Sequence, residues 1–261
     1  MIVAEPKVLV LRAAGVNCNE ETAYAFEVAG ASTQQVHINA LLENPKIVDE
    51  FGAVALPGGF SYGDDISAGR VLAIELDTRL GDVLRSLLGR GGLILGICNG
   101  FQALIKSGLL SDPQSTEDSI SATLVENECH HYVDRWVTVA LNSKKSLFVE
   151  KDDVIDLPIA HAEGRFVAAD EQTLDNMMAD NRVVLQYVTE EGGEATFPGN
   201  PNGSQRNVAG ICDSTGQVLG LMPHPERFIF PWQHPHWTRN KKRENCDGMS
   251  LFYNAVKNLK S

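Results

Sequence analysis

Residues 93–102 read LILGICNGFQ, and this stretch decides the class of fold. Leu93 to Ile97 is a short, continuous apolar run, which is typical of a strand buried on both faces of a sheet. Asn99 to Ser107 follows as an amphipathic segment closed by Gly108, and this pattern predicts a helix. Because a buried strand leads directly into a helix, we expect an α/β fold built around a largely parallel sheet.

The same alternation extends in both directions from residues 93–102. Toward the N-terminus the pattern predicts strands at 7–11, 35–38 and 53–56, and helices at 19–30 and 69–88. Toward the C-terminus, helices are predicted at 170–179 and 248–259, and strand-like runs at 122–126, 136–141, 154–160, 182–188, 208–213 and 218–222. We expect these later strands to be antiparallel additions to the same sheet. No Gly/Ser-rich or Pro-rich linker separates the halves, so we expect a single domain over residues 1–261.

Composition excludes several classes of protein. The 261 residues include 22 Lys+Arg and 34 Asp+Glu, for a net charge of −12, and an acidic chain repels nucleic acid. No apolar run approaches the ~20 residues that cross a bilayer, and the N-terminal MIVAEPK lacks the basic region of a signal peptide. The five cysteines are scattered without a C-x-x-C pair, which indicates a reducing compartment. We therefore expect a cytoplasmic protein that binds neither membrane nor nucleic acid.

Cys98 is the candidate nucleophile. It stands in GICNG (96–100), a G-x-C-x-G pattern between an apolar strand and a helix, and this context is typical of a nucleophile elbow. Glycines on either side permit the strained backbone of such a turn, and a helix N-terminus favours the thiolate. The other cysteines have no such setting, and we predict that they are structural: Cys18, Cys129, Cys212 and Cys246.

His224 and Glu226 are the candidate base and its orienting carboxylate. They stand in PHPER (223–227), directly after the predicted strand at 218–222. Two prolines are expected to hold this segment extended, so that residues two apart point to the same side. Glu226 would then accept one imidazole N–H while the other ring nitrogen faces Cys98, as in a catalytic triad. The histidines at 130, 131, 234 and 236 lack the ligand spacing of a metal site, so we expect no metal.

The negative oxygen that forms in acyl transfer requires hydrogen-bond donors. The backbone N–H of Asn99, the residue after the nucleophile, is one candidate. PGGF (57–60) ends the third predicted strand, and Gly59 is the second candidate because its backbone can turn its N–H inward. An ordinary turn is the alternative for PGGF. A phosphate loop is disfavoured, because the spacing matches neither Walker A nor G-x-G-x-x-G.

Together these motifs resemble those of class I, triad-type glutamine amidotransferases, in which the nucleophile also precedes the His and Glu. The chain is most similar to the glutaminase subunits of phosphoribosylformylglycinamidine synthases, over about residues 7 to 256. The class is indicated by PGGF (57–60), GICNGFQ (96–102) and PHPE (223–226). The subfamily is indicated by GDD (63–65), AGR (68–70), IAHAEGRF (159–166), NPNGS (200–204) and MPHPER (222–227).

The resemblance implies a fold and a set of residue roles. The fold is a flavodoxin-like open mixed sheet with helices on both faces, as in class I glutamine amidotransferases. Cys98 is implied as the nucleophile, His224 as the base and then the acid, and Glu226 as the orienting residue. Gly59 and Asn99 are implied as the oxyanion hole. Contacts with the bound substrate are expected from Gly58, Phe60, Gln102 and Arg135.

The implied reaction is the hydrolysis of L-glutamine to glutamate and ammonia through a cysteinyl thioester. The ammonia is expected to reach a synthetase subunit, with or without a small bridging subunit. That synthetase uses ATP and Mg²⁺ to convert formylglycinamide ribonucleotide into its amidine in purine biosynthesis, and no cofactor is expected in this chain. The alternatives are an amidotransferase for another acceptor, a γ-glutamyl hydrolase or cysteine peptidase on the same elbow, and a regulator that kept the fold.

Two stretches depart from the shorter versions expected of such subunits. Residues 111–119 are polar and predict a surface loop. Residues 231–247 are rich in aromatic and basic side chains and have three interpretations. They form a solvated loop, an element that docks a partner, or a nucleic-acid-binding segment, and the acidic charge of the chain disfavours the last.

Overall fold

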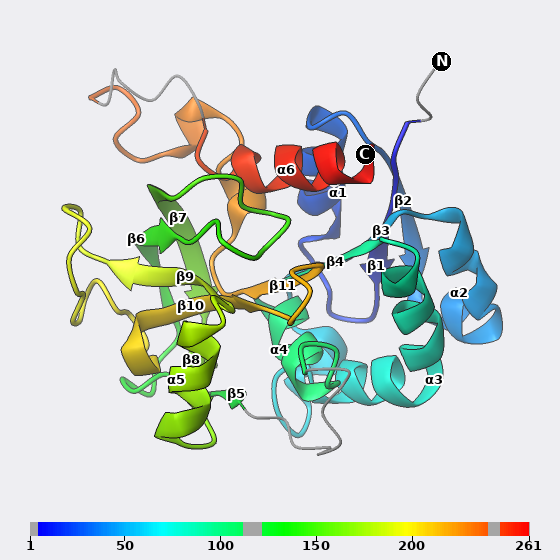
Figure 1. Cartoon of the computed structure of the whole chain (residues 1–261), viewed down its shortest axis with the longest axis horizontal. Coiled ribbons are helices and arrows are strands. Elements are labelled where there is room, and N and C mark those ends of the chain that lie inside the picture. The colour runs from blue at the N-terminus through cyan, green and yellow to red at the C-terminus, as the bar shows by residue number, and fades with distance from the viewer. Residues whose placement is uncertain (1–4, 112–121, 240–245, 261) are drawn as a thin grey trace.

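Five parallel strands form one half of the central sheet in the computed structural model, which describes residues 5–111, 122–239 and 246–260 (Figure 1). Their order is β2-β1-β3-β4-β11. They span Lys7–Arg12 (β1), Ser32–His37 (β2), Ala53–Leu56 (β3), Leu93–Ile97 (β4) and Val218–Leu221 (β11). Every residue of β3, β4 and β11 is buried, as the continuous apolar runs in these strands predict.

Antiparallel strands extend the sheet beyond β11 in the order β11-β10-β9-β6-β7. They span Val133–Leu141 (β6), Asp153–His161 (β7), Val183–Val188 (β9) and Val208–Cys212 (β10). For these four strands the expectation of antiparallel additions is confirmed. It is wrong for β11, which pairs in parallel with β4. It is also wrong for β5 (Ala122–Val125), which pairs with β8 (Arg165–Ala168) in a separate two-stranded sheet.

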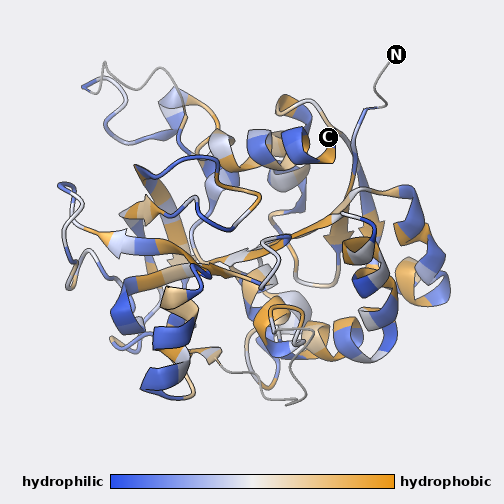
Figure 2. Cartoon of the chain, viewed as in Figure 1, coloured by the Kyte–Doolittle hydropathy of each residue, from blue (hydrophilic) through white to orange (hydrophobic). Residues whose placement is uncertain are grey.

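Helices cover both faces of the sheet (Figure 1). On one face α1 (Asn19–Val28) packs against α6 (Met249–Leu259), and the rings of Phe26 and Phe252 meet edge to face at 4.9 Å between centroids. On the other face lie α3 (Arg70–Gly89) and α4 (Asn99–Lys106). Figure 2 shows the central strands as strongly hydrophobic and much of the outer surface of the helices and loops as hydrophilic. The predicted α/β architecture with a covered mixed sheet is therefore confirmed.

The shorter elements account for most differences from the predicted boundaries. The strand predicted at 35–38 begins earlier, at Ser32, and Ile38 already starts helix α2 (Ile38–Glu43). Strand β8 was not predicted, since its four residues carry no clear alternation. The remaining helix is α5 (Glu171–Ala179), and short 3₁₀ helices span Pro45–Glu50, Ser61–Asp64, Gln205–Asn207, Pro225–Arg227 and Pro231–Gln233. Apart from residue 111, the loop predicted at 111–119 lies outside the described residues.

The carboxyl ends of the parallel strands place four loops at one edge of the sheet. These loops follow β1, β3, β4 and β11, and they contain Cys18, PGGF, Cys98 and His224 respectively. In open α/β sheets this edge is where ligands bind. None of the helices in the described residues is long and apolar enough to cross a membrane.

Candidate active site

Cys98 occupies a strained turn between β4 and α4. Its backbone has φ 50° and ψ −104°, a combination that non-glycine residues seldom adopt outside functional sites. The turn is held because the Cys98 N–H donates to the Leu221 carbonyl at 2.8 Å. Close packing requires Gly100, where a Cβ would lie 1.9 Å from the Leu56 carbonyl oxygen. The predicted elbow is therefore present, with a buried thiol that donates to the Ala160 carbonyl at 3.6 Å.

His224 and Glu226 come together beside this turn. Because β11 pairs in parallel with β4, with Leu221 opposite Ile97, the loop after β11 is brought to the Cys98 turn. The Nδ1 atom of His224 lies 2.6 Å from Oε1 of Glu226, and both side chains are buried. The extended segment predicted for 223–227 is wrong, since residues Pro225–Arg227 form a 3₁₀ turn that brings the two side chains together.

The surroundings of the His224 imidazole favour its charged form. Burial by itself disfavours the charged ring, but the Glu226 carboxylate and the Cys98 thiol together raise its pKa well above the usual value. The Nε2 atom of His224 is buried and has no hydrogen-bond partner among the described residues. Because Glu226 occupies Nδ1, Nε2 is the nitrogen left for the thiol proton, and such contacts commonly tighten only when substrate binds.

The backbone N–H groups of Asn99 and Gly59 have no acceptor among the described residues. Asn99 is the first residue of α4, so no intrahelical carbonyl is available to its N–H. Gly59 has φ 145°, and the loop around it is held by Phe60 N–H donating to Gly15 and by Cys18 N–H donating to Gly58. These bonds leave the Gly59 N–H unpaired among the described residues. The geometry is compatible with an oxyanion hole, and that role of Gly59 and Asn99 stays a prediction.

An aromatic pair lies next to the predicted oxyanion loop. Phe60 is 45% exposed and Tyr132 is 50% exposed, and their ring centroids are 6.4 Å apart. Partial burial, followed by the nearby Cys98, raises the pKa of the Tyr132 hydroxyl, so this ring also lies near the thiol. Tyr132 was not predicted from the sequence, because no motif surrounds it. The predicted substrate contact by Phe60 stays a prediction.

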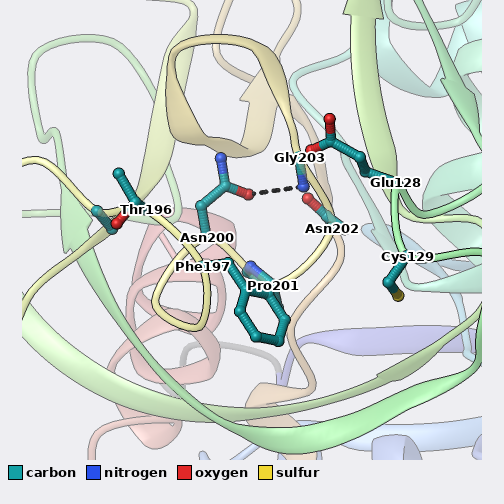
Figure 3. A pocket seen from close by; sticks show the side chains of 9 residues that line it. Glu128, Cys129, Thr196, Phe197, Asn200, Pro201, Asn202 and Gly203 are labelled. Atoms are coloured by element: carbon teal, nitrogen blue, oxygen red, sulfur yellow. Dashed lines mark hydrogen bonds between the residues drawn. The ribbon is translucent and has the colours of Figure 1, made fainter.

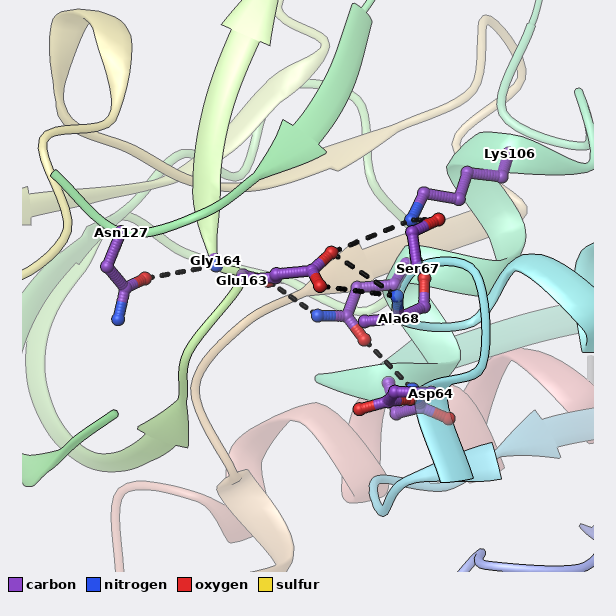
Figure 4. A network of polar contacts seen from close by, with 9 residues as sticks. Asp64, Ser67, Ala68, Lys106, Asn127, Glu163 and Gly164 are labelled. Atoms are coloured by element: carbon purple, nitrogen blue, oxygen red, sulfur yellow. Dashed lines mark hydrogen bonds and ion pairs between the residues drawn. The ribbon is translucent and has the colours of Figure 1, made fainter. Parts of the chain in front are cut away.

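The side chains of Asn99 and Gln102 join α4 to the segment that contains Asp64 and to the loop at 162–164. Figure 4 shows Asp64 and Glu163 in this polar network. Asn99 donates to Gln102 at 2.9 Å and to Asp64 at 3.1 Å, and its own oxygen accepts from Ser61 N–H. The Gln102 amide donates to the Glu163 carbonyl, so both ends of this amide bond to protein. Contact of Gln102 with bound glutamine stays a prediction, and the observed role is to tie the elbow helix to HAEGRF.

Arg135 lies beside a different hollow of the surface. Its guanidinium stands 5.8 Å from the ring centroid of Phe197, and its Nε is buried without a partner among the described residues. Phe197 lines a cleft of about 510 Å³ (Figure 3), together with Glu128, Cys129, Ala195, Thr196, Asn200, Pro201, Asn202 and Gly203. No triad residue lines this cleft. The expected contact of Arg135 with substrate therefore stays a prediction.

Cys18 lies at the site, although the sequence predicted it to be merely structural. Its Sγ and one ligand atom each from His224 and Glu226 lie within 4.8 Å of one another, a set that by atom type suits a metal ion. Arg227 donates to the Cys18 sulfur at 3.1 Å, however, and a cation there repels a metal. The signal available in the sequence was position, since GVNC (15–18) also stands between an apolar strand and a helix.

His161 is a second buried histidine near the triad. Its Nδ1 donates to Oδ1 of Asn127 at 3.0 Å, because that oxygen also accepts from the Gly164 N–H and so serves as an acceptor. Burial, and secondly the charge on His224, lower the pKa of His161 to about 3. The ring is therefore neutral at physiological pH, and its Nε2 has no hydrogen-bond partner among the described residues.

The aromatic segment at 231–247 is anchored through its first residues. His234 is buried, with its ring centroid 4.5 Å from that of Trp136 and 5.5 Å from that of Phe228. The rings of Phe230 and Trp232 stack at 4.6 Å, and Trp232 and Trp237 remain more than half exposed. A wholly solvated loop does not fit residues 231–237, and partner docking stays open. Residues 240–245 lie outside the described part of the chain.

Comparisons with known proteins identify the family of this chain. Residues 5–259 match the model of the CobB/CobQ-like glutamine amidotransferase domain. The phosphoribosylformylglycinamidine synthase subunit PurQ of Dehalococcoides mccartyi is 45% identical over 254 residues, which cover 96% of each chain. The PurQ subunit of Archaeoglobus fulgidus is 37% identical over 268 residues, which cover 97% of this chain and 96% of its own.

Solved structures give the same result at the level of the fold. A chain of the PurLQS structure from Thermotoga maritima matches with a TM-score of 0.73 and 30% identity, covering 97% of this chain and 99% of its own. A glutamine amidotransferase from the same organism matches with a TM-score of 0.56 at 17% identity, covering 99% of each chain. At that identity the second match supports the fold alone.

Proposed function

Because the chain belongs to the family of CobB/CobQ-like glutamine amidotransferase domains, we propose that it is the glutaminase subunit of a phosphoribosylformylglycinamidine synthase. One observation supports this most strongly. Cys98 on a strained elbow lies beside a buried His224–Glu226 pair joined at 2.6 Å, with the N–H groups of Gly59 and Asn99 unpaired nearby. A nucleophile, a base with its carboxylate and two N–H donors are the groups that acyl transfer through a thioester requires.

In the first half of the reaction, the Cys98 thiol gives its proton to Nε2 of His224, and the thiolate attacks the side-chain amide carbon of L-glutamine. The carbonyl oxygen becomes negative and accepts hydrogen bonds from the Gly59 and Asn99 N–H groups, each contributing about 3 kcal/mol to stabilising it. His224 then donates its proton to the amide nitrogen. The C–N bond breaks, ammonia leaves, and a glutamyl thioester remains on Cys98.

In the second half, water attacks the thioester while His224 accepts one of its protons. The same N–H groups hold the second tetrahedral oxyanion, the C–S bond breaks, and glutamate leaves. The proton on His224 returns to the Cys98 thiolate, which restores the starting state. Glu226 keeps the imidazole in the required tautomer and stabilises its charged form throughout.

The ammonia is used by a synthetase partner, with or without a small bridging subunit. That partner converts formylglycinamide ribonucleotide into its amidine with ATP and Mg²⁺, and the residues assigned here need no cofactor for glutamine hydrolysis. The subunit name PurQ of the relatives and the PurLQS assembly support this partnership. We propose that the subunit works in the cytoplasm, and its five free cysteines support a reducing compartment.

We propose that residues 1–261 form one glutaminase domain. The site supports this, because Cys98 comes from the first half of the chain and His224 from the second, and a single nine-stranded sheet joins them. An amidotransferase for another acceptor is distinguished by the synthetase that it activates. A γ-glutamyl hydrolase or peptidase is distinguished by turnover of γ-glutamyl peptides in preference to free glutamine.

The test is glutamine hydrolysis by the complex with the synthetase, measured as glutamate released. We expect Cys98→Ala to lose at least about 1,000-fold in kcat, because the thioester can no longer form. Cys212→Ala is the matched control, since Cys212 is equally buried but lies on β10, and it should retain wild-type activity. Wild-type turnover by Cys98→Ala would overturn the assignment.

A further inference from the structure

Cys18 is a second thiol at the site, beside the proposed triad. Cys18 caps helix α1 just after strand β1, and its side chain is buried. Its Sγ lies within 4.8 Å of a ring nitrogen of His224, and both groups approach Gly58. A Cβ placed on Gly58 would lie 2.7 Å from Cε1 of His224 and 3.1 Å from the Cys18 sulfur. The ring edge, the thiol and the Gly58 backbone therefore converge on one point.

The Cys18 thiol also has polar partners on its other sides. It donates to Oδ1 of Asn17 at 3.2 Å and accepts from Nη2 of Arg227 at 3.1 Å. Arg227 is held in turn by Glu21, whose Oε1 accepts from Nε at 2.8 Å. Burial raises the pKa of Cys18, which keeps the thiol protonated. Cys18 is therefore a neutral hydrogen-bonding group at this site, in contrast to the nucleophile Cys98.

The backbone of Cys18 contacts the predicted oxyanion loop. The N–H groups of Asn17 and Cys18 donate to the Gly58 carbonyl at 3.4 and 3.2 Å. Gly58 immediately precedes Gly59, whose N–H is the proposed oxyanion donor. One residue thus contacts the imidazole through its side chain and the oxyanion loop through its main chain.

We propose that Cys18 is a positioning residue of the glutaminase site, which fixes the ring of His224 relative to the Gly59 N–H. The Glu226 contact fixes one point of the ring, and the thiol at the Cε1 edge supplies a second. With both points fixed, Nε2 is held toward Cys98 while the oxyanion donor keeps its place. This inference rests on the proposed glutaminase function, and it assigns to a second cysteine a role in the same reaction.

The test compares Cys18→Ala, Cys18→Ser and Cys212→Ala in the complex with the synthetase, with glutamate release from L-glutamine as the readout. Cys18→Ala should lower kcat by about tenfold or more, since a small displacement of a catalytic group is costly, and leave KM within about twofold. In a plot of kcat against pH, the alkaline limb of Cys18→Ala should lie at lower pH than that of wild type. The reason is that the charged His224 ring loses a contact that stabilises it. Cys18→Ser keeps a hydroxyl for Arg227 and should lie closer to wild type.

The controls separate the possible failures. Co-elution with the synthetase and an unchanged thermal midpoint show that a variant is folded, and Cys212→Ala should match wild type in every readout. If wild type fails to hydrolyse glutamine, the proposed function itself is wrong. If wild type is active and Cys18→Ala shares its kcat and pH profile, only the role of Cys18 is overturned. Equal losses of kcat in Cys18→Ser and Cys18→Ala, with the pH profile of kcat unchanged, would also overturn the positioning role of Cys18.

Discussion

At the scale of single residues, the site places two thiols against one imidazole. Cys98 stands on a strained backbone at the start of α4, and Cys18 lies beside the His224 ring where both approach Gly58. The two thiols have different neighbours, and we therefore propose different roles for them. Cys98 has a base and unpaired N–H groups beside it, whereas Cys18 has Asn17 and Arg227 as hydrogen-bond partners. Burial alone, which the two share, does not distinguish the nucleophile from the positioning residue.

The neutral ring of His161 gives a prediction about stability and pH. Its pKa is about 3 in the folded protein and about 6.5 in an unfolded chain, so the fold favours the uncharged form. This contribution is fully present above about pH 6.5 and is lost as the pH falls toward 3. Between pH 7 and pH 5 the free energy of unfolding of wild type should fall by about 2 kcal/mol more than that of His161→Gln.

Urea unfolding at a series of pH values provides the measurement for His161. His131→Gln is the matched control, because His131 is exposed and should leave the pH slope of wild type unchanged. Parallel curves for wild type and His161→Gln would contradict the buried, uncharged state of this ring.

At the scale of elements, the site depends on how closely α4 approaches the sheet. Gly100 lies in the first turn of α4 directly against the end of β3, where the PGGF loop begins. Side chains of α4 then join the helix to the Asp64 loop and to HAEGRF through Asn99 and Gln102. The elbow is therefore held from three directions, which is how a strained nucleophile persists in a folded protein.

Gly100→Ala should disturb this packing and lower stability. The added Cβ would lie 1.9 Å from the Leu56 carbonyl oxygen, so α4 must move, at a cost of about 3 kcal/mol in the free energy of unfolding. The matched control is Gly89→Ala at the end of α3, where a Cβ meets no atom within 4 Å. That control should change stability by less than about 1 kcal/mol. Urea unfolding measures both, and equal stabilities would rule out the close approach of α4 to β3.

At the scale of the whole molecule, strands from both halves of the chain bring the catalytic groups together at one edge of the sheet. Two exposed aromatic rings lie beside this edge. Phe60 and Tyr132 are about half exposed, and Phe60 belongs to the predicted oxyanion loop. In the free subunit the Cys98 thiol also donates to the Ala160 carbonyl at 3.6 Å. In the proposed reaction the thiol gives its proton to His224, so this contact with Ala160 must be released.

We accordingly expect the synthetase partner to activate the glutaminase. Adding it should raise kcat/KM for L-glutamine by about tenfold or more, equivalent to about 1.4 kcal/mol of transition-state stabilisation. The physical reason is that the Cys98 thiol of the free subunit donates to Ala160, a contact that must be released before the thiol can react. Ammonia released without an acceptor would also be wasted, which favours coupling the site to the partner. A titration with the synthetase, against albumin at equal concentration, measures the effect. An unchanged kcat/KM across the titration would contradict the coupling.

Local sequence patterns are enough to predict the class of fold, the elbow at Cys98, and His224 and Glu226 as the candidate base and its carboxylate. Each of these depends on local pattern, such as a buried strand followed by GICNG, or a strand followed by PHPE. The parallel pairing of β11 with β4 follows only from the tertiary structure. This pairing brings His224 close to Cys98, although more than a hundred residues separate them in the chain. The position of Cys18 beside His224 also follows only from the tertiary structure, as do the hydrogen bonds of the Gln102 amide within the protein. Strand pairing and the burial of a thiol depend on contacts between distant segments, and no spacing within a single stretch of sequence specifies them.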